Sequence, residues 1–388
     1  MRDQSSLAIR RLVWKTTPFL LEDFTNPKNA ENSFIAFTPT ENGTGFPIIQ
    51  GVWRVDDILV SYDGKRMIVV DVAKKELLRV DGVGLRGVKH DQILDLNVDG
   101  KRWEGDVLNG NPYGWGRLYN GDGRLVYEGF RIGTVNVCYG FGYYGNGGVI
   151  EYKGELCGGK RWGRGTYYDR NGGVQYDGEW MDDDHMEESV ELKEGREWIH
   201  NHINALKVRD GCCNGEQWKE LKWNWMPFLK SLKVGKECFT NVEAFDLSGV
   251  SDLVSVVIGE NSFTNAKAFD LSGVSDLKSV VIGDECFTNA DSFRITGVGK
   301  LESVAIGKNS FTKEKDWKGN EPTRHFCVKD CPSLKELKMG HHSFSDYSEC
   351  KIENVDALEA IAFGDVNEAS YNFPYASLGL RSLLVRSE

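Results

Sequence analysis

Residues 253–276, LVSVVIGENSFTNAKAFDLSGVSD, are followed directly by residues 277–300, LKSVVIGDECFTNADSFRITGVGK. The two stretches align without a gap, so the sequence repeats with a period of 24 residues. An internal repeat of this length indicates an array of stacked units, each of which contacts only its neighbours. This repeat decides the fold of the C-terminal half of the chain.

The same unit continues on both sides of this pair. Its leading leucines are Leu229, Leu253, Leu277, Leu301, Leu334, Leu358 and, two residues early, Leu380. An insertion of nine residues, around 313–322, separates two of the units, and residues 203–208 match the first strand of an earlier one. We therefore expect about eight units over residues 201–388, with divergent end units that cap the array against water.

Each unit contains two short stretches in which apolar and polar residues alternate, as is typical of β-strands. In the first stretch the inward positions are aliphatic, as at Val256 and Ile258. In the second they include phenylalanine, as at Phe269 and Leu271. Stacking turns these positions into continuous internal columns, and glycines close the corners. The pattern predicts a right-handed solenoid of parallel strands.

The outward positions of the first strands form an apolar stripe edged by serine. Under this alternation, the side chains that face water on adjacent coils are Ser255, Val257, Ser279, Val281, Ser303 and Ala305. The valines and the alanine have no core role in this register, and exposed apolar stripes often mark contact sites. We predict that these residues bind a protein partner. A homodimer contact and cover by another part of the chain are the alternatives.

A second periodicity occupies residues 101–181. Dyads of an aromatic residue and a glycine recur every 24 or 25 residues, at Trp103 and Gly105, Tyr127 and Gly129, Tyr152 and Gly154, and Tyr176 and Gly178. Glycine permits a tight hairpin turn and the close approach of the next hairpin, while the aromatic residue packs on one face. Four dyads in register indicate repeated hairpins.

Both arrays resemble known repeat families. Residues 102–180 closely resemble the MORN repeat (membrane occupation and recognition nexus), which implies a twisted ribbon of successive antiparallel hairpins. Residues 200–388 resemble BspA-like leucine-rich repeats, but they lack the asparagine that closes the turn of ordinary leucine-rich repeats, which argues against a helix-backed horseshoe. The predicted fold is mainly β, a MORN-type antiparallel hairpin ribbon followed by a leucine-rich-repeat-like β-solenoid.

The remaining segments are less regular. Residues 1–100 are predicted to be β-rich and partly irregular, chiefly in the first 50. Residues 62–65 are expected to form a type I′ turn between strands near 55–60 and 67–72. Residues 182–200 contain seven acidic residues from Asp182 to Glu194, and the prediction for this connector is a solvated helix or linker.

Composition excludes several function classes. A net charge of −11 argues against binding to the nucleic-acid backbone. No apolar stretch reaches the roughly 18–20 residues that span a bilayer, and the charged N-terminus does not resemble a secretory signal. Nine cysteines, an odd number, fit free thiols in a reducing compartment. We expect a cytoplasmic protein, with peripheral association to a membrane or the cytoskeleton as the alternative.

Candidate chemical sites all have simpler structural explanations. His200 and His202 would lie on one strand face, and with Cys212 and Cys213 they could suggest zinc. However, Cys212 occupies the same repeat position as Ser262 two coils later. This position requires only a small side chain. The glycine clusters fall at hairpin turns and lack the lysine of a phosphate-binding loop. We therefore expect no catalytic residue, metal or cofactor.

A basic cluster leaves a second function open. Lys160, Arg161 and Arg164 surround Trp162. MORN repeats are associated with lipid headgroups, and tryptophan favours the membrane interface. The structural alternative is that Trp162 packs hairpin against hairpin. The favoured hypothesis is a non-enzymatic interaction scaffold, and the alternative is a membrane-peripheral module that binds anionic lipid or the cell cortex through the hairpins.

Overall fold

The computed structural model describes residues 31–38, 48–96, 100–145, 148–195, 198–313, 321–364 and 369–381. Strands dominate this part of the chain, and its helical elements are two short 3₁₀ turns, η2 (Glu216–Trp218) and η3 (Trp223–Trp225). The chain divides into two compact units, Met1–Phe37 with Ile48–Met186, and Thr38–Pro47 with Glu187–Glu388. The predicted mainly β fold is confirmed. The irregularity expected for residues 1–50 falls mostly outside the described residues.

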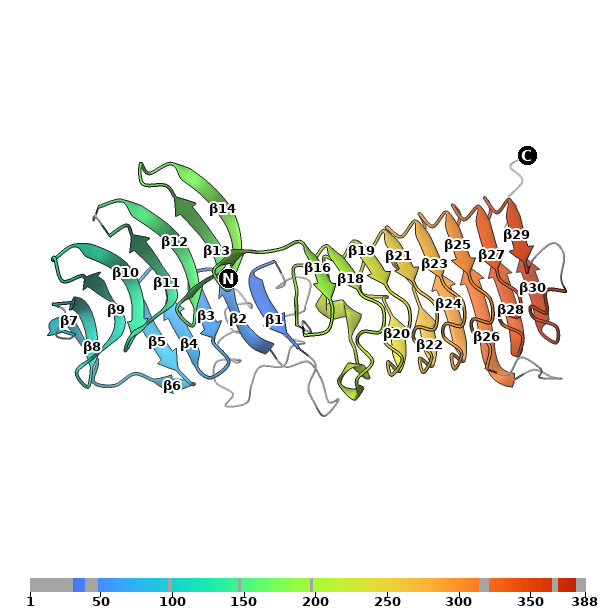
Figure 1. Cartoon of the computed structure of the whole chain (residues 1–388), viewed down its shortest axis with the longest axis horizontal. Coiled ribbons are helices and arrows are strands. Elements are labelled where there is room, and N and C mark those ends of the chain that lie inside the picture. The colour runs from blue at the N-terminus through green and yellow to red at the C-terminus, as the bar shows by residue number, and fades with distance from the viewer. Residues whose placement is uncertain are drawn as a thin grey trace, which may run out of the picture. The chain divides into compact units, whose positions relative to one another are not determined.

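The first unit begins with an antiparallel sheet in which β1 to β6 pair in sequence order (Figure 1). Its strands are β1 (Ser33–Phe37), β2 (Ile48–Val55), β3 (Ile58–Tyr62), β4 (Met67–Asp71), β5 (Glu76–Val80) and β6 (Val83–Gly84). Their central residues are buried, among them Phe37, Leu59 and Val70. These side chains form the core of this sheet.

The expected hairpin between β3 and β4 is present, but its turn is not of type I′. Four residues, 63–66, separate the strands, and of these only Gly64 has a positive φ, 87°. A type I′ turn needs positive φ at both central residues. Instead, the Asp63 carboxylate accepts hydrogen bonds from the backbone N–H groups of Lys65 (3.0 Å) and Arg66 (2.8 Å). This side-chain cap stabilises the longer turn.

A nine-stranded antiparallel sheet of successive hairpins follows, as predicted, although it begins before residue 101. Its strands are β7 (Lys89–Asp95), β8 (Arg102–Leu108), β9 (Asn111–Tyr119), β10 (Leu125–Ile132), β11 (Val135–Tyr143), β12 (Ile150–Cys157), β13 (Lys160–Tyr168), β14 (Val174–Met181) and β15 (Asp184–His185). Tight turns join the hairpins. Asn109 and Gly110, at φ 49° and 75°, form a two-residue turn with the signs of type I′.

A line of paired glycines crosses this sheet at the predicted dyads. The cross-strand pairs are Gly105–Gly116, Gly116–Gly129, Gly129–Gly140, Gly140–Gly154, Gly154–Gly165 and Gly165–Gly178. A Cβ atom on Gly165 would lie 2.2 Å from the hydroxyl oxygen of Tyr152. The bare backbone therefore makes room for the aromatic side chain, which explains why the two residue types recur together.

Each aromatic residue of a dyad also satisfies a carbonyl group. Its polar end donates a hydrogen bond to the carbonyl oxygen three residues ahead: Trp103 to Asp106 (3.1 Å), Tyr127 to Phe130 (2.8 Å), Tyr152 to Glu155 (2.9 Å) and Tyr176 to Glu179 (3.0 Å). In the first three dyads, the accepting residue lies where the strand register shifts. A bulged residue leaves the regular ladder, and its buried carbonyl needs another partner. The aromatic side chain supplies it.

The second unit contains two parallel sheets whose strands alternate along the chain, which confirms the predicted β-solenoid. The first sheet consists of β16 (Ser189–Leu192), β18 (Ala205–Val208), β19 (Ser231–Val234), β21 (Ser255–Ile258), β23 (Ser279–Ile282), β25 (Ser303–Ile306), β27 (Glu336–Met339) and β29 (Ala360–Phe363). The second consists of β20 (Ala244–Asp246), β22 (Ala268–Asp270), β24 (Ser292–Thr296), β26 (Glu321–Lys329), β28 (Tyr347–Glu353) and β30 (Ser377–Arg381). Figure 1 shows the strands stacked coil upon coil from β19 to β29.

Two columns of stacked phenylalanine rings run through the solenoid. In the corner column, ring centroids lie 5.1 Å apart between Phe239 and Phe263, and 5.2 Å apart between Phe263 and Phe287. The column continues through Phe311, Phe344 and Phe373. All six of these residues have positive φ, a backbone region that is unusual for a bulky side chain. The second column, on the second sheet, contains Phe245, Phe269, Phe293 and Phe326.

The ends of the array differ from the prediction. The parallel sheet begins one strand earlier, at β16, which pairs with β18. Leu380 does not start a new unit, because it lies in β30 and pairs with Ile352 of the second sheet. A count of leucines cannot distinguish the two strands of a coil, since leucine occupies inward positions in both.

Of the helix or linker expected for residues 182–200, the helix is wrong for the part that the structure describes. The described residues of this segment include β15, β16 and the two-residue strand β17 (Ile199–His200). Glu191 accounts for much of the difference, because its carboxylate lies 2.6 Å from Lys207 Nζ and 3.0 Å from Arg209 on the neighbouring strand segment. These hydrogen bonds lower the pKa of Glu191 to about 2. Cross-strand pairing with basic residues therefore replaces the solvated acidic helix.

The glycine line generates a testable prediction. Gly165→Ala should lower the free energy of unfolding by about 1–3 kcal/mol, because the new methyl group collides with Tyr152. Gly142→Ala, in the adjacent hairpin, is the matched control, since the nearest atom to its Cβ would lie 4.0 Å away. The control should change stability by less than about 0.5 kcal/mol. Chemical denaturation of both variants measures the difference, and equal losses would show that the glycine pairs do not require a bare backbone.

Candidate partner-binding surface

The structure confirms the predicted facing of the first strands. In β23, Val280 and Ile282 are buried, while the intervening Val281 is 43% exposed. The same alternation holds in β21, where Val256 and Ile258 are buried and Val257 is partly exposed. The valines therefore belong to the surface and not to the core.

Parallel pairing places the predicted residues side by side. Val257 pairs with Val281, and Val281 pairs with Ala305. A parallel row of serines, Ser255, Ser279 and Ser303, runs beside them. Neighbouring strands lie about 4.8 Å apart, so the three apolar side chains form a continuous row about 10 Å long. We call these six residues the outer stripe.

Lysines flank the outer stripe along the solenoid. Lys233 of β19 pairs with Val257, and Lys338 of β27 pairs with Ala305. Both lysines are exposed at the outward position of their strand. The stripe therefore has a small, flat apolar centre and a lysine at each end, of which Lys338 is ion-paired with Glu336 of its own strand (2.6 Å).

The basic cluster predicted for lipid binding does not form an open patch. Trp162 is 2% exposed, and its indole N–H donates a 2.7 Å hydrogen bond to the carbonyl oxygen of Phe34. Its predicted place at a membrane interface is therefore wrong, and the packing alternative holds. Lys160 and Arg161 form ion pairs with Asp182 (2.5 Å) and Asp183 (3.3 Å).

Arg161 and Arg164 are also engaged with their neighbours in the sheet. The Arg161 guanidinium lies 4.3 Å from the ring centroid of Trp180. The exposed Arg164 donates its backbone N–H to the carboxylate of Glu155 (3.1 Å). Burial raises the pKa of Glu155 to about 7, against the opposing effect of this hydrogen bond and of Arg54. Trp162, Lys160 and Arg161 therefore serve the packing and ion pairing of this sheet, whereas the Arg164 side chain is exposed.

The histidines and cysteines do not converge. His200 is buried, with its Nε2 atom 2.9 Å from the carbonyl oxygen of Glu187, while the His202 ring packs 4.9 Å from that of Phe228. Among the described residues, no group of three or more His, Cys, Asp or Glu side chains is placed to hold a metal ion. These contacts agree with a structural explanation for the motif.

The repeat position shared by cysteine and serine is a hydrogen-bond donor site. The Cys286 thiol and the Ser262 hydroxyl donate to the carbonyl oxygens of Gly259 (3.1 Å) and Gly235 (3.0 Å), each in the preceding coil. Burial raises the pKa of the Cys286 thiol to about 12, which keeps it protonated. Such a thiol acts as a small packing group and not as a nucleophile.

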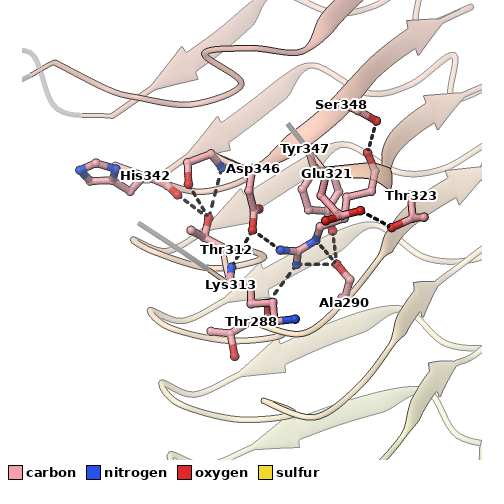
Figure 2. Close-up of polar contacts among 12 residues, drawn as sticks. Thr288, Ala290, Thr312, Lys313, Glu321, Thr323, His342, Asp346, Tyr347 and Ser348 are labelled. Carbon is pink, nitrogen blue, oxygen red and sulfur yellow. Dashed lines mark hydrogen bonds and ion pairs between the residues drawn. The ribbon is translucent and has the colours of Figure 1, made fainter. Parts of the chain in front are cut away.

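Sequence reasoning missed a buried polar cluster beside the inserted segment. Figure 2 shows Asp346 turned towards Lys313 and the Thr288–Ala290 corner. The Arg324 guanidinium is 1% exposed and forms an ion pair with Asp346. It also donates to the carbonyl oxygens of Ala290 and Thr288. The available clue was an arginine two residues before the column residue Phe326, because arginine is rarely buried without a partner.

This cluster closes the gap that the insertion opens in the array. Earlier coils bury a small residue, Ala266 or Ala290, beside the phenylalanine columns. Past the insertion, Arg324 aligns with Asp291 of the preceding coil. The Asp291 side chain is exposed, whereas the Arg324 side chain points inwards and is buried. Tyr347 covers the guanidinium at 4.9 Å and donates its hydroxyl hydrogen to Ala290 (2.8 Å). The paired charges thus take the place of a small buried residue at the insertion, while both phenylalanine columns continue past it.

The first unit also has a polar cleft of about 770 Å³ between the β4–β5 turn and β7 to β10. His90 Nδ1 lies 2.5 Å from Asp106 Oδ1, and Glu128 contacts both Lys75 (3.5 Å) and Arg117 (3.2 Å). The residues that line it include no serine, threonine or cysteine beside the histidine. Its charged side chains are largely paired with one another.

The chain matches no protein-family model, no curated protein and no solved structure. Over the described ranges, no helix is long and apolar enough to cross a membrane.

The buried cluster predicts that Asp346 contributes much more to stability than Asp276, which forms an exposed ion pair. Asp346→Asn should cost about 3–5 kcal/mol of stability, because it leaves the Arg324 charge buried without its partner. Asp276→Asn breaks the exposed ion pair with Lys300 (2.5 Å) and should barely change the thermal midpoint. Thermal unfolding of the two variants checks this, and a harmless Asp346→Asn would contradict an anchoring role for the cluster.

Proposed function

We propose that this chain is a non-enzymatic repeat scaffold that binds a protein partner through the outer stripe. The β-solenoid supplies a rigid, repetitive surface, and the hairpin sheet supplies a second repeat array in the same chain. The families that the two arrays resemble, BspA-like leucine-rich repeats and MORN repeats, fit this kind of protein. Repeat arrays commonly bind partners over extended surfaces.

One observation carries the proposal, the outward row of Val257, Val281 and Ala305, in which Val281 is exposed and the other two are partly exposed. The solenoid does not need apolar residues at these positions, since Lys233 and Lys338 occupy the same row in other coils. Exposing these apolar side chains to water is unfavourable, and a partner that covers them removes this unfavourable free energy. The small neighbouring serines let the backbone of a partner approach closely.

The exposed Lys233 at one end of the stripe indicates the chemistry of the partner. A segment with a small apolar part followed by an acidic residue would complement the stripe and Lys233, whereas Lys338 at the other end already pairs with Glu336. Salt should weaken such binding through the acidic residue only, because screening affects charges and not apolar contact. The membrane alternative lacks a comparable surface, since Trp162 is buried.

The proposal predicts a selective loss of binding. In the full chain, Val257→Arg with Val281→Arg should reduce capture of the partner at least tenfold, because two charges enter an apolar contact. Stability should change by less than about 1 kcal/mol, because both sites are on the surface. Quantitative affinity purification compares this variant with the wild type.

Val174→Arg is the matched control, because Val174 lies outside the stripe and is 58% exposed. It should leave capture unchanged. Equal capture by all three proteins would exclude the outer stripe as the binding surface. Unfolding of the double variant would instead show that these valines belong to the core. Co-sedimentation with anionic liposomes tests the membrane alternative in parallel.

A further inference from the structure

Core side chains are exposed at the C-terminal end of the solenoid. Leu378 and Leu380 of β30 pair with Cys350 and Ile352, and therefore occupy the inward columns of the second sheet. Cys350 and Ile352 are 3% and 4% exposed, whereas Leu378 and Leu380 are 72% and 69% exposed. Two leucines in core positions are thus uncovered by the described residues.

The first sheet ends in the same way. Phe363 of β29 pairs with Met339, which is 2% exposed, yet Phe363 itself is 43% exposed. β29 and β30 are also the last strands of their sheets, so no described strand lies beside their outer edges. Unpaired strand edges beside apolar side chains are templates for pairing with another chain. The end therefore combines apolar surface with unpaired backbone groups.

The opposite end of the second sheet is closed by the chain itself. The Trp223 ring packs edge to face on Phe245 of β20, with centroids 5.3 Å apart. Trp218 packs on Phe239 at 5.5 Å and is fully buried. A second molecule could not continue the array from this end without displacing the tryptophans. Head-to-tail stacking is therefore disfavoured.

We propose that a second copy of this chain covers the open end, so that two solenoids meet at β29 and β30 around a two-fold axis. Such a contact joins the same surface on both molecules and closes after two copies. The second copy offers the two things that the end lacks, apolar residues at the same coil spacing and two strand edges. Across this axis the edge strands would pair antiparallel, and the apolar side chains of the two ends would cover one another. This dimer surface is distinct from the outer stripe.

Mass measurement on the full chain tests the dimer. Light scattering coupled to size exclusion should give twice the mass of one chain for the wild type. Leu378→Glu with Leu380→Glu should give the mass of one chain, because four carboxylates would enter the contact. Val257→Arg with Val281→Arg should remain dimeric, which separates this surface from the partner-binding surface. A wild type with single-chain mass, or a dimer insensitive to the leucine changes, would overturn the proposal.

A second measurement guards against a variant that misfolds. In the wild type, amide hydrogen exchange in β29 and β30 should slow as the protein concentration rises, because association protects the edge strands. Exchange in β20, at the closed end, should be independent of concentration. Independence at both ends would exclude the second copy as the cover and indicate that another part of the same chain fills that place.

Discussion

The solenoid depends on placing one phenylalanine of each coil in the left-handed backbone region with its ring against that of the next coil. This conformation costs an ordinary residue about 1–2 kcal/mol, so it persists only where the surroundings determine it. Rings about 5 Å apart on both sides, as around Phe287, provide those surroundings. The same close stacking requires glycine at the neighbouring corner. A Cβ atom on Gly259 would lie 2.5 Å from the carbonyl carbon of Gly235 in the coil before.

The columns fix the inward positions and leave the outward ones free. The proposed partner-binding residues belong to this second group: lysine, valine and alanine all occupy the row of the outer stripe without altering the register. The open end is a different case, because Leu378 and Leu380 occupy inward positions and the next layer is not among the described residues. One physical constraint thus accounts for the regularity of the fold and points to the surfaces available for partners.

Sequence periodicity predicted the two arrays, the parallel strands and the facing of Val257 and Val281. A repeated pattern shows both the structure of one unit and the residues that contact the next unit. It could not predict features that depend on contacts between distant residues. The expectation of a helix or linker missed β16 because Glu191 finds its basic partners on the next strand segment. The choice between packing and a lipid surface for Trp162 stayed open because its hydrogen-bond partner, Phe34, lies far away in the sequence. Arg324 is buried only because the insertion leaves space beside Ala290.

The central claim is that coil-to-coil register, and not the content of any one coil, holds the solenoid together. Removing residues 277–300 deletes one whole 24-residue coil and joins Asp276 to Leu301, an equivalent junction. Removing residues 277–288 deletes half a coil with its first-sheet strand β23, so that β24 would directly follow β22 and the two sheets could no longer alternate. Thermal unfolding followed by circular dichroism compares the two proteins. The account predicts a cooperative transition for the 24-residue deletion and its loss for the shorter one. Similar unfolding of both would contradict it.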